Sequence, residues 1–129
     1  MAGSNEQLLR DAYAIFAKGD IEGFFALCTP GITFHIPGNT PLSGHHTGKE
    51  AFLPILGKVM EISGGTFQEE VHDVTTSDTH GTALLLHRFE RNGKPVEYNT
   101  AHVWHIADGK LSEFWELPVD QAEYEAAWG

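Results

Sequence analysis

Apolar residues in the first part of the chain recur at the spacing of a helix. One face of this predicted helix collects Leu8, Leu9, Ala12, Tyr13 and Phe16. Ser4 and Gln7 form a capping-box pattern before the run, and Gly19 follows it as a stop signal. Asp20 is placed to cap a second, shorter helix that reaches about Leu27. The chain is therefore expected to open with two helices.

The next segment combines strand and helix signals. Residues 32–36 are β-branched or aromatic and predict a strand, whereas residues 39–48 are polar and turn-forming and predict a loop. Thr47 and Glu50 form a second capping box before a third helix. Pro54 lies beyond the first turn of that helix, so we expect a kink or a later start there. The apolar face of the helix carries Phe52, Ile55, Leu56, Val59 and Met60.

From residue 66 to residue 117 the sequence has the pattern of strands joined by short turns. The dipeptides Asn-Gly at 92–93 and Asp-Gly at 108–109 are the ones that two-residue type I′ hairpins prefer. Such turns fix the register of the strands on either side. After the strands, Asp120 begins a third capping box for a terminal helix that ends at Trp128.

Strand alternation sorts the side chains of this region onto two faces of one sheet. The first face is rich in aromatic rings, and we place on it Leu85, His87, Phe89, Val96, Tyr98, Thr100, His102, Trp104, Ile106, Leu111, Glu113, Trp115 and Leu117. The second face collects Leu84, Leu86, Arg88, Glu90, Glu97, Asn99, Ala101, Val103, His105, Ser112, Phe114 and Glu116. Because rings dominate the first face, we expect helices to cover it, in an α+β fold of two layers.

Composition narrows the class of protein. The 129 residues are 41% hydrophobic and 20% charged, which fits one globular domain over residues 1–129. The formal net charge of −10 disfavours nucleic acid and anionic lipid as partners. Cys28 is the single cysteine, so a reducing compartment fits best, and no apolar run approaches the ~20 residues of a membrane span. We therefore expect a cytoplasmic protein.

Short motifs occur in a recognisable order along almost the whole chain. They include Gly19-Asp20-Ile21-Glu22, Phe34-His35-Ile36-Pro37-Gly38, Gly65-Thr66-Phe67, Val71-His72-Asp73-Val74, His102-Val103-Trp104, Glu113-Phe114-Trp115 and Asp120-Gln121-Ala122. This order resembles the SnoaL-like branch of the nuclear transport factor 2-like superfamily, to which ketosteroid isomerases also belong. The resemblance implies a cone-shaped fold: a curved antiparallel sheet wraps around N-terminal helices and one deep pocket.

The superfamily holds isomerases, polyketide cyclases, epoxide hydrolases, dehydratases and proteins that only bind, so fold alone does not give the activity. In the isomerases a carboxylate base lies just before the Pro that ends the first strand, where this chain has Ile36. Their tyrosine acid aligns with Ala12, next to Tyr13, and their neutral aspartic acid aligns with His102. The resemblance thus places His102 in the pocket and leaves the isomerase base position without a carboxylate.

Three residues on the first face are candidates for catalysis. His102 is a candidate general acid, general base or hydrogen-bond donor, because imidazole titrates near neutrality, and His87 lies on the same face. Glu113 is expected opposite Trp104, where it could orient an imidazole. The alternatives are structural histidines and a solvated glutamate at the pocket mouth.

The predicted pocket is apolar and free of metal and cofactor. Its expected lining residues are Tyr13, Phe16, Phe34, Ile36, Phe52, Tyr98, Trp104 and Trp115. The chain has eight histidines, but none at the spacing of a helical metal site, and no Gly-x-Gly-x-x-Gly motif for a nucleotide. We expect a small hydrophobic or aromatic ligand. In one hypothesis the protein is a cofactor-free isomerase, cyclase or hydratase/dehydratase-like enzyme that acts on an apolar carbonyl compound. In the alternative it is a non-catalytic module that binds a hydrophobic metabolite.

The second face carries an apolar patch that predicts a homodimer. The patch comprises Leu84, Leu86, Ala101, Val103 and Phe114. Charged and polar residues are expected at or around its rim, namely Arg88, Glu90, Glu97, His105 and Glu116.

Overall fold

The computed structural model describes residues 2–129, which form four helices and six strands. In chain order these are α1 (Ala2–Ala17), α2 (Ile21–Ala26), β1 (Cys28–Ile36), β2 (Gly44–Thr47), α3 (Lys49–Ser63), β3 (Gln68–Thr76), β4 (His80–Arg91), β5 (Lys94–Ala107), β6 (Lys110–Pro118) and α4 (Gln121–Trp128). The predicted order of helices and strands is confirmed, with one further strand, β2, inside the segment predicted as a loop.

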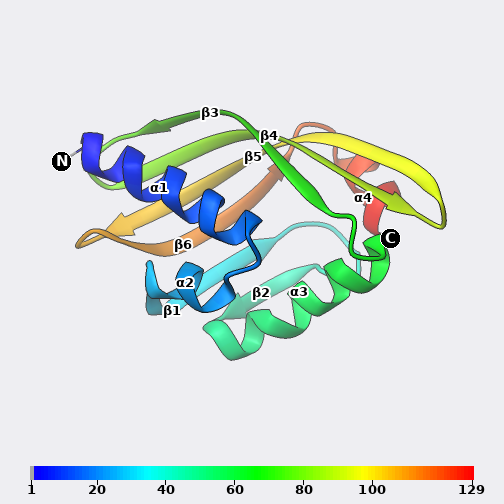
Figure 1. Cartoon of the computed structure of the whole chain (residues 1–129), viewed down its shortest axis with the longest axis horizontal. Coiled ribbons are helices and arrows are strands. Elements are labelled where there is room, and N and C mark those ends of the chain that lie inside the picture. The colour runs from blue at the N-terminus through cyan, green and yellow to red at the C-terminus, as the bar shows by residue number, and fades with distance from the viewer. Residues whose placement is uncertain (1) are drawn as a thin grey trace.

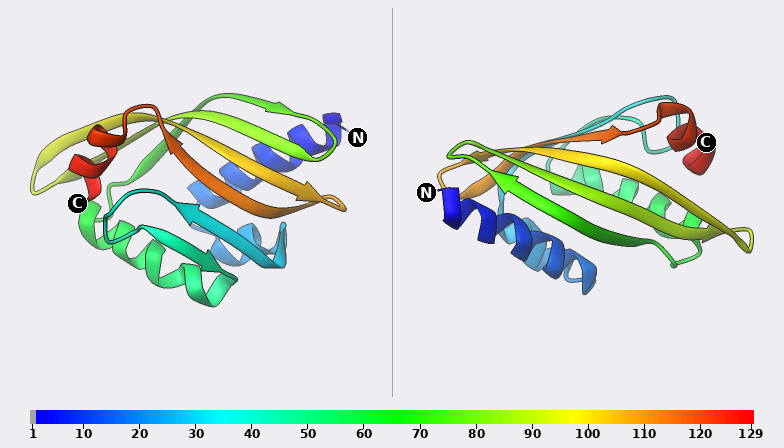
Figure 2. Two further views of the ribbon diagram at one scale, coloured as in Figure 1. Left: turned by 180° about the vertical axis from the view of Figure 1, so that it is seen from behind. Right: turned by 90° about the horizontal axis from the view of Figure 1, so that it is seen from above.

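All six strands belong to one sheet in the order β2-β1-β6-β5-β4-β3. Neighbouring strands are antiparallel except β1 and β6, which pair in parallel. The sheet curves, and α1, α2 and α3 lie on its concave side, while α4 lies at one end (Figures 1 and 2). The α+β fold with a curved sheet around helices is therefore confirmed, and a cavity lies between the two layers.

Two of the predicted helix caps are present. Asp20 accepts a hydrogen bond from the Gly23 backbone N–H at 2.9 Å, and Asp120 accepts from the backbone of Ala122 at 2.9 Å. The predicted cap at Ser4 is wrong, because α1 already begins at Ala2. The start of this helix is instead tied to the turn between β3 and β4 by Asn5, which donates to two backbone carbonyls of that turn.

The third helix begins without a capping box. Its N-cap is Gly48, whose φ of 83° suits glycine, and no side chain caps it. The helix starts at Lys49 and runs through Pro54, so the expected later start does not occur. The residues before it are held in β2, where His46 pairs with Phe34 of β1. Strand pairing thus fixes the chain just before the helix.

Both predicted type I′ hairpins are present. Arg91 pairs with Lys94 across the first turn, and Ala107 pairs with Lys110 across the second. The turn residues all have positive φ, between 51° and 78°, as this turn type requires. The first hairpin gives β4 and β5 the predicted register, so His87, Tyr98, His102 and Trp104 are buried under the helices.

A β-bulge in β6 changes the predicted face of the residues after it. Ile106 pairs with Leu111, but His105 pairs with Glu113, which leaves Ser112 as an extra residue. One extra residue moves every later side chain to the opposite face. The prediction that Glu113 and Trp115 face the helices is therefore wrong. Leu117 was also expected to face the helices, but it is exposed. Phe114 and Glu116 were expected on the outer face, but they are buried on the inner one.

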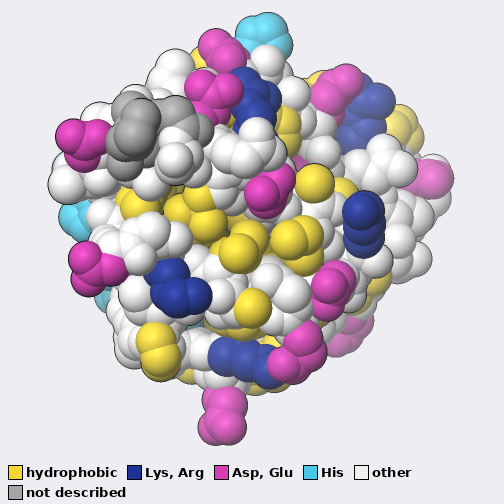
Figure 3. Space-filling model, turned by 60° about the vertical axis from the view of Figure 1, so that its left-hand side comes forward, with side chains coloured by type: hydrophobic (Ala, Val, Ile, Leu, Met, Phe, Trp, Pro, Cys, Tyr) yellow, Lys and Arg dark blue, Asp and Glu magenta, His cyan; other side chains and the backbone are white. Residues whose placement is uncertain are grey.

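The core continues from the sheet into the helices through stacked aromatic rings. Phe34 of β1 and Phe52 of α3 stack with ring centroids 3.8 Å apart, and Phe89 of β4 stacks on Trp128 of α4. On the face drawn in Figure 3, hydrophobic side chains gather in the middle and charged side chains surround them. Among residues 2–129, no helix has both the length and the apolar character that crossing a membrane requires.

Candidate functional site

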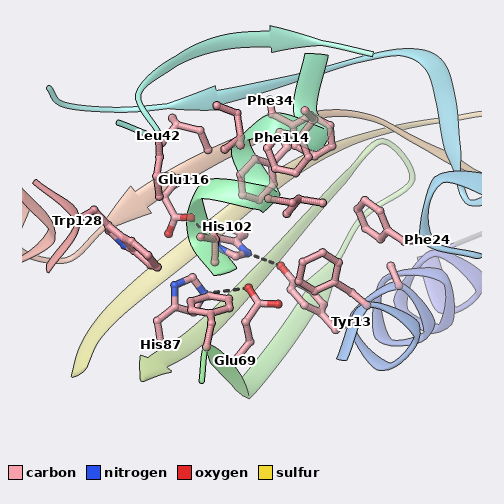
Figure 4. A pocket seen from close by; sticks show the side chains of 18 of the residues that line it. Tyr13, Phe24, Phe34, Leu42, Glu69, His87, His102, Phe114, Glu116 and Trp128 are labelled. Atoms are coloured by element: carbon pink, nitrogen blue, oxygen red, sulfur yellow. Dashed lines mark hydrogen bonds and ion pairs between the residues drawn. The ribbon is translucent and has the colours of Figure 1, made fainter. Parts of the chain in front are cut away.

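An apolar cavity of about 100 Å³ lies between the concave face of the sheet and helices α1 and α3. Its walls are mainly aromatic and include Phe16, Phe24, Phe34, Phe52, Phe67 and Phe114. Polar side chains converge on one part of this wall, as Figure 4 shows. They form two hydrogen-bonded sets, each containing a glutamate, a histidine and a tyrosine.

The first set, which we call the Glu116 network, consists of Glu116, His102 and Tyr13. Glu116 Oε1 lies 3.0 Å from His102 Nε2, and His102 Nδ1 lies 2.6 Å from the Tyr13 hydroxyl. Trp104 Nε1 donates to the same hydroxyl at 3.1 Å, and Thr100 donates to the other carboxylate oxygen of Glu116. Glu116 and His102 are 7% and 3% exposed, so this ion pair is shielded from water.

The surroundings favour an imidazolium–carboxylate pair in this network. Burial raises the pKa of Glu116, but the charge and hydrogen bond of His102, with smaller contributions from His87 and Thr100, lower it to about 2. Burial lowers the pKa of His102, but the charge and hydrogen bond of Glu116 outweigh burial, and the pKa is raised. Both partners therefore shift toward their charged forms.

A charged His102 determines how the Tyr13 hydroxyl is used. An imidazolium donates from both ring nitrogens, so His102 Nδ1–H and Trp104 Nε1–H both donate to the Tyr13 oxygen. The hydrogen of Tyr13 is then available to a third group on the cavity side. Burial and the nearby charge of Glu69 raise the pKa of Tyr13 well above its usual value, which keeps this hydrogen in place. Tyr13, which lines the cavity, thus keeps a hydrogen that these two bonds do not use.

The second set, the Glu69 network, consists of Glu69, His87 and Tyr98. His87 Nε2 lies 2.9 Å from Glu69 Oε2, and His87 Nδ1 lies 2.8 Å from the Tyr98 hydroxyl. Trp128 Nε1 donates to that hydroxyl at 2.7 Å. The side chain of Glu69 is 13% exposed, more than the 8% of Glu116. Its carboxylate is therefore the acid–base group of the two networks nearer to solvent.

The two networks touch, and their contact forms a candidate cation site. The rings of His87 and His102 have centroids 5.3 Å apart, and one ligand atom from each, together with one from Glu69, lies within 4.8 Å of the others. Two imidazoles and a carboxylate are a donor set for several transition metals. All four ring nitrogens, however, already have hydrogen-bond partners in the two networks. A cation is therefore not needed to satisfy these side chains.

Most of the predicted site residues lie on the cavity wall. These are Tyr13, Phe16, Phe34, Ile36, Phe52, His87, Tyr98, His102 and Trp104. Glu113 and Trp115 lie on the outer face because of the bulge in β6. There Glu113 binds His35 at 2.5 Å and His105 at 3.3 Å, and Trp115 packs against the same two rings.

Three polar residues of the site were missed by the sequence analysis. Glu116 was assigned to the outer face because the bulge before it left no local signal. Glu69 could have been found by alternation, since Glu69 and Val71 share one face of β3 and Phe67, just before the strand, continues the same alternation. Trp128 was predicted only as the end of a helix, and its place in the cavity depends on how α4 docks onto the sheet.

The chain is similar to known proteins over almost its full length. The model of the SnoaL-like domain family matches residues 9–114. An uncharacterised protein of Mycobacterium tuberculosis is 28% identical over 123 residues, which cover 94% of this chain and 93% of the relative. The structure of Bal32a, from a soil-derived mobile gene cassette, has a TM-score of 0.92 at 26% identity and covers 99% of this chain and 98% of Bal32a. TerC, co-crystallised with polyporic acid, has a TM-score of 0.86 at 20% identity, over 96% and 97% of the two chains.

Proposed function

Because the chain belongs to the SnoaL-like domain family, a branch of the nuclear transport factor 2-like superfamily, we propose that it binds a small apolar carbonyl compound and moves a proton on it without a cofactor. The observation that carries the proposal is the placement of Tyr13 and Glu69 on the same cavity wall, beside the contact of the two networks. One is a hydrogen-bond donor and the other a carboxylate. The chemistry is that of cofactor-free isomerases, cyclases and dehydratases.

The reaction step needs a base and a group that stabilises the oxygen. Glu69 removes a proton from the carbon next to the carbonyl, and the C–H electron pair becomes the C=C bond of the enolate. Tyr13 donates its hydrogen bond to the carbonyl oxygen, where negative charge develops. Return of the proton from Glu69 to the same or another carbon completes an exchange or an isomerisation.

The two histidines act through these groups. His102, charged by its pairing with Glu116, donates to the Tyr13 oxygen and makes that hydroxyl a stronger donor. His87 holds the Glu69 carboxylate by a hydrogen bond of 2.9 Å. The predicted catalytic candidates His102 and His87 are therefore proposed as positioning residues, and Glu113 has no role in this scheme.

The size and polarity of the cavity support a compact apolar ligand. The wall is largely aromatic, and the polar groups are confined to one region, which is the usual design of a small-molecule site. TerC, a fold neighbour, was co-crystallised with polyporic acid, so an organic molecule was studied with that protein. The ligand of the present chain is proposed to be neutral and hydrophobic or aromatic.

The test is exchange of α-protons for deuterium in small cyclic ketones, followed by NMR in D₂O. Tyr13→Phe and Glu69→Gln are each expected to slow the exchange by about 10²-fold or more, because each removes one partner of the proton transfer. Glu113→Gln is the matched control and is expected to exchange at the wild-type rate. Ketone binding, seen by tryptophan fluorescence, with no exchange above the solvent rate would reject catalysis in favour of a binding module.

We also propose that the outer sheet face forms a homodimer. Leu84 and Leu117 are 46% and 48% exposed on that face, and Ala101, which pairs with both, lies between them. Leu86 and Val103 lie on the same face, two residues along their strands from Leu84 and Ala101. Trp115 replaces the predicted Phe114 in this surface, since the bulge turns Phe114 inward. Burial of these side chains against the same face of a second copy would remove an apolar patch from water.

A further inference from the structure

A second, larger hollow adjoins the cavity. It has a volume of about 820 Å³ and is lined by the C-terminal part of α1, by α3 and by the start of β3, which are labelled in Figure 1. Five residues line both spaces, namely Phe16, Leu56, Val59, Phe67 and Glu69. The cavity and this hollow, which we call the vestibule, therefore share part of their wall.

The sizes of the two spaces set what each can hold. An engineered cavity of about 150 Å³ in another protein binds benzene, so the 100 Å³ of the inner cavity suit a ring of five or so carbon atoms and little more. Sites for drug-sized molecules measure about 300–1,000 Å³, the range in which the vestibule falls. A ligand larger than a small ring must therefore extend into the vestibule.

The chemistry of the vestibule favours a neutral apolar group. Phe16, Val59, Met60 and Phe67 provide apolar wall. Its lining carries two positively charged side chains, Lys18 and Arg88, and two negatively charged ones, Glu69 and Glu70. Arg88 is already paired with Glu70 at 3.3 Å and Glu97 at 3.4 Å. The vestibule therefore does not attract an anionic or a cationic tail.

We infer that the ligand has two parts: a small carbonyl-bearing ring in the inner cavity and a long, neutral, apolar tail in the vestibule. The inference rests on the proposed function for the chemistry of the ring. Glu69 lines both spaces, so the carbon that loses its proton is the ring carbon to which the tail is attached. In D₂O that C–H bond breaks with transfer of its proton to Glu69, and a deuteron returns to the same carbon from the exchanged carboxylic acid.

The test compares cyclopentanone with 2-heptylcyclopentanone, which carries such a tail on the α-carbon. Binding is followed by tryptophan fluorescence, because Trp104 and Trp128 line the cavity, and exchange at the α-carbon by NMR. The tailed ketone is expected to bind at least about tenfold more tightly than cyclopentanone, since the heptyl chain leaves water.

A substitution that fills the vestibule gives the decisive comparison. Gly57 of α3 lines the vestibule, and a Cβ added there meets nothing within 4 Å, so Gly57→Leu is expected to add side-chain volume at the vestibule wall. In wild type, the dissociation constant of cyclopentanone is expected to exceed that of 2-heptylcyclopentanone. In Gly57→Leu, the ratio of the first constant to the second is expected to fall at least fivefold. Gly57→Gln occupies the same space and gives a second measure of the ratio. Gly31→Leu is the matched control, since Gly31 also has open space but lies in β1 away from the vestibule.

The outcomes separate this inference from the proposed function. Equal affinity for the two ketones, or an unchanged ratio in both Gly57 variants, would overturn the bipartite ligand even if cyclopentanone exchanges its protons. A tail-dependent gain in affinity that Gly57→Leu removes would support the vestibule as a binding subsite, even if neither ketone exchanges. In that case only the proton transfer would be rejected.

Discussion

At the scale of single residues, the position of Glu116 determines the electrostatics of the site. Glu116→Gln keeps the size of the side chain and an oxygen acceptor but removes the charge that faces His102. We expect a loss of about 3 kcal/mol in the free energy of unfolding, as for other buried pairs that lose one partner. Glu113→Gln, three residues away on the same strand, removes only partly exposed pairs and is expected to cost less than about 1 kcal/mol. Urea denaturation measures both.

The same pair predicts how stability depends on pH. The pKa of Glu116 is lowered on folding to about 2, so its contribution is present above about pH 4.5 and is lost as the pH falls toward 2. The pKa of His102 is raised, so its contribution is present below about pH 6.5 and is lost as the pH rises through the folded value. The pair therefore stabilises the protein most between about pH 4.5 and 6.5. The Glu116→Gln variant should lose this maximum; a variant with the wild-type pH profile would contradict the charged pair.

At the scale of helices and strands, two glycines should respond with opposite signs to the same substitution. Gly93 lies in the first hairpin at a φ of 78°, so Gly93→Ala should destabilise the protein by about 1–2 kcal/mol. Gly57 lies within α3 with open space around it, so Gly57→Ala should stabilise the protein by about 0.5–1 kcal/mol. Thermal unfolding of the two variants checks the difference, and a change of the same sign in both would contradict the assignment of these backbones.

The register of the sheet shows what sequence can and cannot predict at this scale. The hairpin at 92–93 has a local signal, and from it the inward direction of His87 and His102 follows by alternation. The bulge at Ser112 has no such signal, because it arises where β6 must pair with β5 on one side and with β1, in parallel, on the other. The histidines and tyrosines of the two networks were therefore predictable from short-range patterns. Glu116 required knowledge of contacts between distant strands.

At the scale of the whole molecule, the dimer proposal depends on the outer face as the bulge leaves it. Sedimentation at micromolar concentration should give a mass of two 14.2 kDa chains. Leu84→Glu places a charge in the exposed patch and should shift the mass toward one chain without unfolding the protein. Glu61→Gln, on the exposed face of α3, serves as a control for general effects of surface charge. A single-chain mass at every concentration would contradict the proposal.

The cavity is assembled from distant parts of the chain, and this bears on the order of folding. The bond between Tyr13 and His102 joins residues 89 positions apart, and the Glu69 network gains its Trp128 partner only when α4 docks. Contacts of this kind form late, because long loops must close first. During synthesis the ring-rich face of the sheet is thus built before the helix that closes one end of it. Until that helix arrives, the rings of Phe89 and Tyr98 lack their contacts with Trp128, and the nascent protein is expected to present this end of the core to chaperones.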